Sequence, residues 1–175
     1  MTLSARSGAR LAALLATFAC DGGLQPAAEP TSCPAGFVGI CGTVRFQGPV
    51  PANTHYVLIV AFENFPQSSG DLFTFKPPLP PQLPHGDTVA FYMLPLEPGT
   101  YDWVLAVWKE VGTLTIETAD SLLREAGFYR DPLDTLRAVP VVVPAGASAD
   151  SIDFVVDYTN MHPVSFWFPA PAARR

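Results

Sequence analysis

Short hydrophobic segments separated by proline and glycine run along most of the chain after residue 33, and their pattern predicts β-strands. The first segment alternates between two faces and stops at Gly48-Pro49. Residues 55–62 are hydrophobic on both faces, as in a central strand covered on both sides. The predicted strands comprise residues 42–46, 55–62, 88–94, 100–109, 138–143 and 151–158. With turns between them, about seven strands predict an all-β fold, an antiparallel β-sandwich.

Two further segments depart from this strand pattern, and a third extends it. Residues 119–126, between Thr118 as a cap and Gly127 as a stop, predict one short helix. Residues 76–84 are so rich in proline that they predict a rigid connection, with a ligand for an aromatic groove as the alternative. Residues 164–168 are nearly all hydrophobic and predict one more strand that seals a sheet edge, with an exposed adhesive tail as the alternative.

The N-terminal segment has the pattern of an export signal. Arg6 and Arg10 stand in a stretch without acidic residues, and a hydrophobic block follows over residues 11–19. The block ends on a small residue directly before Cys20, which resembles the lipobox at which bacterial lipoproteins are cleaved and lipidated. We therefore expect a signal peptide over residues 1–19 and a lipid on Cys20. The alternatives are an ordinary secretory signal cut nearby and a hydrophobic first helix with a buried cysteine.

The three cysteines agree with this interpretation. If Cys20 carries the lipid, Cys33 and Cys41 remain as a pair, and an oxidising compartment outside the cytoplasm would let them form a disulfide. A metal site of two thiolates is less favoured, because no further ligands stand nearby at suitable spacing. Residues 20–32 are poor in hydrophobic side chains and predict a flexible, lipid-anchored tether, so the β-sandwich domain is expected over residues 33–175.

Turn and strand motifs of the domain carry a family resemblance. Gly42-Thr43-Val44, residues 96–101 and residues 141–146 followed by 152–154 resemble the transthyretin-like, or carboxypeptidase-regulatory-like, modules of exported bacterial proteins. The likeness covers most of residues 42–158, and residues 67–87 and 113–136 depart from it as insertions. The resemblance implies an immunoglobulin-like, prealbumin-type β-sandwich with a binding or structural role. It does not imply an activity.

Composition and charge narrow the classes of partner. The chain has 175 residues, of which 49% are hydrophobic and 15% charged, so it can build a core. Its 16 acidic and 10 basic residues give a formal charge of −6, which argues against binding nucleic acid. No hydrophobic run approaches the roughly 18–20 residues of a membrane-spanning helix. We expect contact with the membrane through the lipid on Cys20 alone.

Catalytic motifs are missing from the sequence. The three histidines are not spaced as metal ligands, and no serine stands in a nucleophile-elbow motif. The acidic residues lack the spacing of a calcium loop. We therefore expect no catalytic residues, no metal and no cofactor, and predict that the protein is not an enzyme. The alternative is a hydrolase or metal enzyme whose residues meet only in the fold, such as His55, Asp102, Asp131 and His162.

Aromatic side chains are the best candidates for a binding surface. Trp108, Trp167, Phe128 and Tyr129 could stack on sugars or on a partner's apolar side chains, although Trp103 and one other tryptophan are expected in the core. The resulting hypothesis is a non-catalytic, lipid-anchored β-sandwich for binding or structural support at the cell envelope, in the periplasm or on the cell surface. Its partner would be an envelope protein or a glycan, and the alternative is a carbohydrate-binding module.

Overall fold

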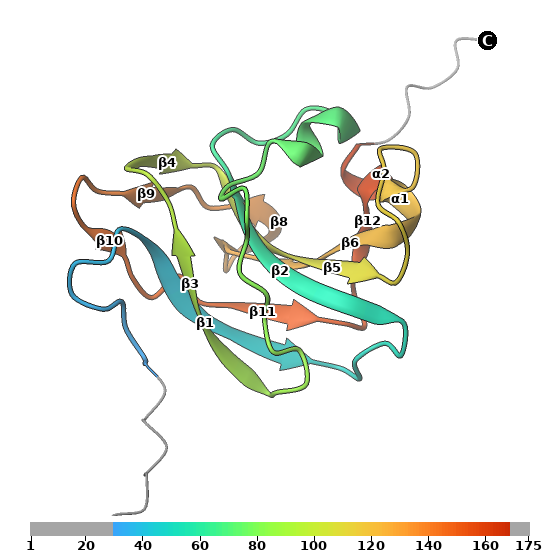
Figure 1. Ribbon diagram of the computed structural model, residues 1–175, viewed down its shortest axis with the longest axis horizontal. Coiled ribbons are helices and arrows are strands. Elements are labelled where there is room, and N and C mark those ends of the chain that lie inside the picture. The colour runs from blue at the N-terminus through green and yellow to red at the C-terminus, as the bar shows by residue number, and fades with distance from the viewer. Residues whose placement is uncertain (1–29, 169–175) are drawn as a thin grey trace, which may run out of the picture.

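The structure is a computed structural model that describes residues 30–168 (Figure 1). Strands dominate this region, and its only helices are three short ones: η1 (Ser69–Phe73), α1 (Ala119–Leu122) and α2 (Val164–Trp167). The predicted all-β class is therefore confirmed. The predicted signal peptide, Cys20 and most of the tether lie outside the described residues. No helix in residues 30–168 is long and apolar enough to cross a membrane.

Sheet A is built around β1 (Gly39–Gln47). β3 (Val89–Pro95) pairs antiparallel with one edge of β1, and β10 (Ser148–Ala149) and β11 (Phe154–Asp157) pair with the other edge. Both of these last pairs are parallel, so the prediction of a purely antiparallel sandwich was wrong. The reason is the route of the chain: it returns from β9 at the end of the sheet where β1 begins, so β10 and β11 run in the direction of β1.

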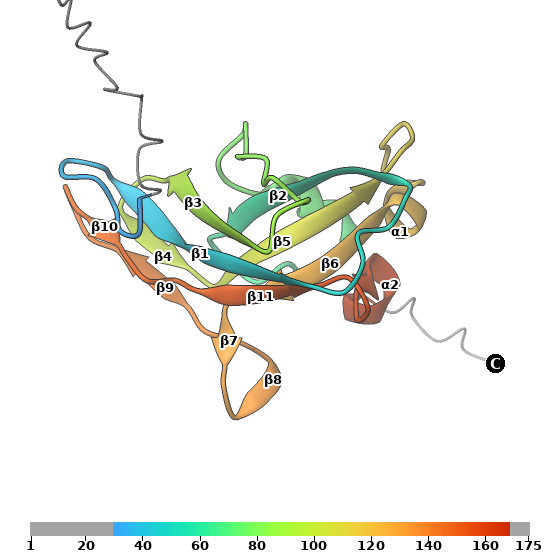
Figure 2. The same ribbon diagram turned by 90° about the horizontal axis from the view of Figure 1, so that it is seen from below.

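Sheet B is fully antiparallel. Its order is β12 (His162–Pro163), β6 (Leu123–Phe128), β5 (Trp103–Glu110) and β2 (Thr54–Phe62). Two small ribbons complete the fold: β4 (Gly99–Tyr101) with β9 (Val141–Val143), and β7 (Arg130–Asp131) with β8 (Asp134–Ala138). Figure 2 shows the β7–β8 hairpin projecting from the body of the molecule.

The main hydrophobic core lies between sheets A and B. Alternate residues of each strand contribute to it because side chains of a strand point to opposite faces. Its buried members include Ile40, Val44, Tyr92, Leu94 and Val156 from sheet A, and Val57, Ile59, Val104, Ala106 and Trp108 from sheet B. The sheets meet where β6 passes β11. A Cβ atom at Gly127 would lie 1.9 Å from the carbonyl oxygen of Val155, so this approach requires glycine.

The helix predicted over residues 119–126 is wrong in its second half. Only Ala119–Leu122 is helical, and Leu123–Phe128 is strand β6. Pairing with β5 satisfies the backbone of this segment, with Leu105 opposite Phe128 and Lys109 opposite Leu123. Tertiary pairing thus overrides a local pattern that favours a helix.

Residues 164–168 also differ from the prediction, because Val164–Trp167 is one helical turn rather than an edge strand. In a helix, residues three apart lie on the same face. Val164 and Trp167 accordingly both reach the outer face of sheet B, where they line a common cavity. The strand pattern failed here because a run this short and uniformly hydrophobic fits either structure.

Three predicted strands are shorter or divided. Asp102 separates β4 from β5 within the strand predicted over residues 100–109, and these two strands belong to different sheets. The strand predicted over residues 138–143 is interrupted at Pro140, between β8 and β9, because proline has no N–H to donate to a neighbouring strand. The last predicted strand, residues 151–158, is reduced to β11. Strand β2 has the predicted span but lies at the edge of sheet B, although its hydrophobic pattern indicated a central strand.

The proline-rich segment lies along this free edge of β2. The backbone N–H of Ala61 donates to the carbonyl of Lys76 at 2.9 Å, and that of Ile59 donates to Pro81 at 3.1 Å. Leu83 donates in return to the carbonyl of Val57 at 2.8 Å. The segment therefore covers a hydrophobic strand that would otherwise offer its edge to another chain.

The predicted disulfide joins Cys33 to Cys41, whose Cα atoms are 5.5 Å apart. Cys41 is fully buried in β1, so the bond ties the beginning of the domain to the central strand of sheet A. The closed loop is short, with a sequence separation of 8 residues.

Removing this bridge tests its contribution to stability. We expect the double variant Cys33→Ser/Cys41→Ala to lose about 2–3 kcal/mol in the free energy of unfolding, because the unfolded chain regains the entropy of the open loop. Urea unfolding measures the loss, and the unsubstituted protein under reducing conditions is the matched control. Equal stability of the oxidised protein and the double variant would contradict the prediction.

Candidate functional site

The second hydrophobic cluster of the protein lies on the outer face of sheet B, away from sheet A. It is formed by the residues of β2, β5 and β6 that alternate with those of the main core, namely Val60, Phe62, Trp103, Leu105 and Phe128. Phe65, Leu72, Phe75 and Trp167 pack against them. Because these covering residues come from the η1 region and α2, irregular segments rather than a third sheet close this face. Figure 1 shows η1 in green and α2 in red near the same end of the molecule.

Between the sheet and its cover is a cavity of about 120 Å³. Its walls are mostly apolar. Sheet B contributes Tyr56, Leu58, Val60, Phe62, Trp103, Leu105, Val107 and Leu123, and the cover contributes Leu72, Phe73, Phe75, Leu114, Val164, Trp167 and Phe168. Arg124, Glu125 and His162 complete the lining. The cavity can hold a small hydrophobic molecule, with Arg124, Glu125 and His162 at one side of it.

Trp103 is the centre of the aromatic side chains at this site. It is 2% exposed, and its ring centroid lies 4.8 Å from that of Phe65 and 5.2 Å from that of Trp167. Phe128 packs edge-on against both tryptophans, at 6.1 Å from Trp103 and 5.6 Å from Trp167. The Nε1 atoms of Trp103 and Trp167 are buried and have no hydrogen-bond partner among the described residues.

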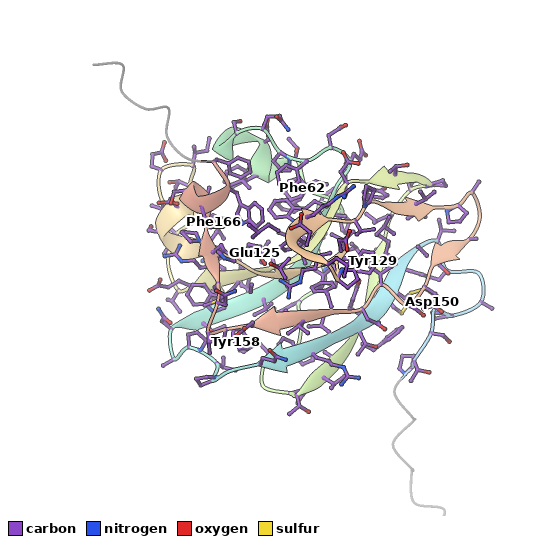
Figure 3. All side chains as sticks on the ribbon, turned by 180° about the vertical axis from the view of Figure 1, so that it is seen from behind. Phe62, Glu125, Tyr129, Asp150, Tyr158 and Phe166 are labelled. Atoms are coloured by element: carbon purple, nitrogen blue, oxygen red, sulfur yellow. A yellow bond between two sulfur atoms is a disulfide. The ribbon has the colours of Figure 1, made fainter. Side chains whose placement is uncertain are left out.

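A hydrogen-bonded pair of His162 and Glu125 lies at the polar side of the cavity. His162 Nδ1 is 2.8 Å from Glu125 Oε2, and the side chains of His162 and Glu125 are 22% and 6% exposed. The His162 ring stacks on Phe166 with a centroid distance of 4.2 Å. Figure 3 shows Glu125 and Phe166 on the side of the molecule opposite Asp150. Burial raises the pKa of Glu125, and the hydrogen bond and charge of His162 and the charge of Arg130 oppose this effect.

The predicted binding residues are divided between the two faces of sheet B. Phe128 and Trp167 belong to the outer cluster, and Trp167 lines the cavity. Trp108 is 4% exposed in the main core, where its Nε1 donates to Thr54 Oγ1 at 2.7 Å. Tyr129 packs against the main core. Neighbours in a strand point to opposite faces, so the four residues do not form one surface.

The tryptophans do not form an exposed platform for stacking a sugar. Trp103 and Trp108 are buried, and only Trp167 is half-buried within residues 30–168. This geometry favours an enclosed ligand over a glycan bound on an open face.

The residues suggested for an enzyme do not meet either. His55 lies in β2 beside the Lys109 end of β5, with its Nδ1 3.3 Å from Lys109 Nζ, whereas Asp102 precedes the opposite end of β5. A strand of this length separates them by roughly 20 Å. Asp131 lies in the β7–β8 hairpin. No group of three His, Cys, Asp or Glu residues within residues 30–168 could hold a metal ion.

Sequence reasoning missed the cavity and the Glu125–His162 pair. The signal for the cavity was present, because residues 55–62 and 100–109 are hydrophobic on both faces and each face must be covered. Among the covering segments, only residues 164–168 stand out as hydrophobic, and their pattern predicts an edge strand rather than a cover. The local pattern predicts a helix at Glu125 and therefore gives no indication of a partner in β12.

Comparisons with protein-family models, with curated proteins and with solved structures found no match for this chain. The resemblance to transthyretin-like modules therefore stays a prediction that depends on turn and strand motifs. Function must be argued from the site itself.

The raised pKa of Glu125 gives a pH-dependent stability. The folded state holds the proton of this carboxyl more tightly than the unfolded chain, so its favourable contribution is full below the ordinary pKa of 4.5 and is lost as pH rises through the folded pKa. Glu125→Gln cannot ionise. We expect the free energy of unfolding of the unsubstituted protein, relative to this variant, to fall over that window.

Urea unfolding from about pH 4 to about pH 8 measures this difference. Glu63→Gln, which changes an exposed glutamate, is the matched control. Parallel pH profiles for the unsubstituted protein and Glu125→Gln would show that burial of the carboxyl has no such effect.

Proposed function

We propose that the protein is an exported, lipid-anchored β-sandwich that binds a small hydrophobic ligand at the cell envelope and does not act on it chemically. The observation that carries the proposal is the cavity of about 120 Å³ on the outer face of sheet B. Its lining is mostly apolar, so a small hydrophobic ligand would bury apolar surface there and make van der Waals contacts with the lining side chains.

The disulfide supports the export part of the proposal. Such bonds persist in oxidising compartments and are rare in the cytosol. The Cys33–Cys41 bond stands at the beginning of the domain, directly after the predicted tether, and leaves Cys20 as the single remaining cysteine of the chain. This is the pattern expected when the first cysteine carries a lipid and the other two form a structural bridge.

The placement of the cavity agrees with an anchor at the N-terminal side. Figures 1 and 2 both show the start of the described chain, in blue, at the end of the molecule opposite α2. Val164 and Trp167 of α2 line the cavity. A tether leading to a membrane would therefore leave the ligand site on the far side of the domain, where a soluble ligand has access.

Lipidation is tested by substitution of Cys20. We expect Cys20→Ala to abolish incorporation of radiolabelled palmitate and to release the protein from the membrane fraction, because the substitution removes the only sulfur available for the lipid. The double variant Cys33→Ser/Cys41→Ala retains Cys20 and should be labelled like the unsubstituted protein. Recovery of the unsubstituted chain without label, unprocessed in the cytosol, would contradict the anchor.

Ligand binding is tested by filling the cavity. Val107 lines it, and a phenylalanine there would occupy part of the space. We expect the unsubstituted protein to bind ethylbenzene and Val107→Phe to bind it at least about tenfold more weakly, because the ring takes the place of the ligand. Titration calorimetry measures both affinities.

Val142→Phe is the matched control, since Val142 is 62% exposed in β9 and does not line the cavity. It should bind ethylbenzene like the unsubstituted protein. Equal affinities for Val107→Phe and the unsubstituted protein would place any binding elsewhere.

A further inference from the structure

We infer that the Glu125–His162 pair is a gate through which the ligand enters the cavity on the outer face of sheet B. The inference depends on the proposed binding function and adds to it the route of the ligand. Two observations carry it. The pair stands between this cavity and a second hollow that opens to solvent, and the His162 side chain is held in place by few contacts.

The second hollow lies beside β6, where this strand passes β11. Its volume is about 180 Å³. Besides Glu125 and His162, its polar lining consists of Gln47, Arg130, Asp157 and Asn160. Three of these side chains, those of Gln47, Arg130 and Asn160, are exposed. The hollow therefore opens to solvent.

Glu125 and His162 are the residues that line both this hollow and the apolar cavity. Three other hollows within residues 30–168 have no lining residue in common with the cavity. Of these four hollows, the one beside β6 is thus the one that adjoins the cavity. The wall between the two spaces is the hydrogen-bonded pair, in which His162 Nδ1 lies 2.8 Å from Glu125 Oε2.

The His162 side chain can leave this wall more easily than that of Glu125, because it is 22% exposed and Glu125 only 6%. Within the described residues its ring makes one hydrogen bond, stacks on the half-exposed Phe166 and meets Trp167 edge-on. One hydrogen bond contributes little net free energy compared with that of unfolding, and partly exposed side chains change rotamer rapidly. Rotation of His162 toward solvent therefore opens the wall while the strands stay paired.

The other walls of the cavity are built more firmly. Sheet B forms one of them, with backbone hydrogen bonds between β2, β5 and β6. In the cover, the Trp167 ring packs against Trp103 and Phe128, with centroid distances of 5.2 and 5.6 Å. Displacing Trp167 would expose more apolar surface than displacing His162, which is unfavourable. Phe73 is 42% exposed and lines the cavity from η1, so it marks the competing route.

Removal of the gate tests the route. His162→Ala deletes the ring from the shared wall, so ethylbenzene should enter and leave the cavity at least about fivefold faster, with a much smaller change in Kd. The line shape of the ethylbenzene methyl signal in NMR spectra, recorded at several ligand concentrations, measures both rate constants. Phe73→Ala widens the competing route and should change the two rates less than His162→Ala does.

Filling the outer hollow is the opposite test. Gln47 lines the hollow and not the cavity, so Gln47→Trp narrows the route and keeps the Glu125–His162 pair. Ethylbenzene should then enter and leave at least about threefold more slowly at an unchanged Kd. Thr100→Trp is the matched control, because Thr100 is exposed and lines a hollow that does not adjoin the cavity. Its rates should equal those of the unsubstituted protein.

The outcomes separate the inference from the proposed function. Binding of ethylbenzene with the same rates in the unsubstituted protein, His162→Ala and Gln47→Trp would overturn the gate and leave hydrophobic binding standing. Faster exchange in Phe73→Ala than in His162→Ala would also overturn it, since the ligand would then enter beside η1. Absence of binding to the unsubstituted protein would overturn both. If His162→Ala does not fold, the rates of Gln47→Trp decide.

Discussion

The pairing of β2 with β5 places hydrophobic side chains on both faces of sheet B. Neither face can remain in water without loss of the favourable free energy of burial. Sheet A covers the inner face and forms the main core with it. The outer face has no partner sheet, so the chain must cover it with the segments that remain: the η1 region, the residues before β6, and α2.

Covers of this kind pack differently from sheets. Two sheets interdigitate along regular rows of side chains, whereas a loop and two helical turns contribute large aromatic residues from unrelated directions. On the outer face of sheet B this arrangement leaves a cavity and two buried indole donors without partners among the described residues. The Glu125–His162 pair fixes β12 and α2 beside it, since it joins β6 to the segment before Val164. The same pair thus supports the fold and borders the proposed site.

Short segments and single residues also hold the two sheets in place. The proline-rich segment bonds to the free edge of β2 through backbone groups of Lys76, Pro81 and Leu83. The disulfide fixes the first residues of the domain against β1. Gly127 allows β6 to pass β11 at a distance that no side chain would permit. These three features depend on proline, cysteine and glycine, which differ from other residues in their backbone or covalent properties. The sequence alone draws attention to them, although it does not show their partners.

Sequence alone determined the all-β class, the spans of β2 and β3, and the Cys33–Cys41 bond, because alternation, turn residues and cysteine number are local properties of the chain. It also predicts an export signal and a lipid on Cys20, which lie outside the described residues. Tertiary structure decided what depends on partners far apart in sequence. Residues 123–128 became a strand because β5 offers them hydrogen bonds, and residues 164–167 became a helical turn because it places Val164 and Trp167 under sheet B. The division of Trp108 and Trp167 between two faces, and with it the site, follows from those contacts.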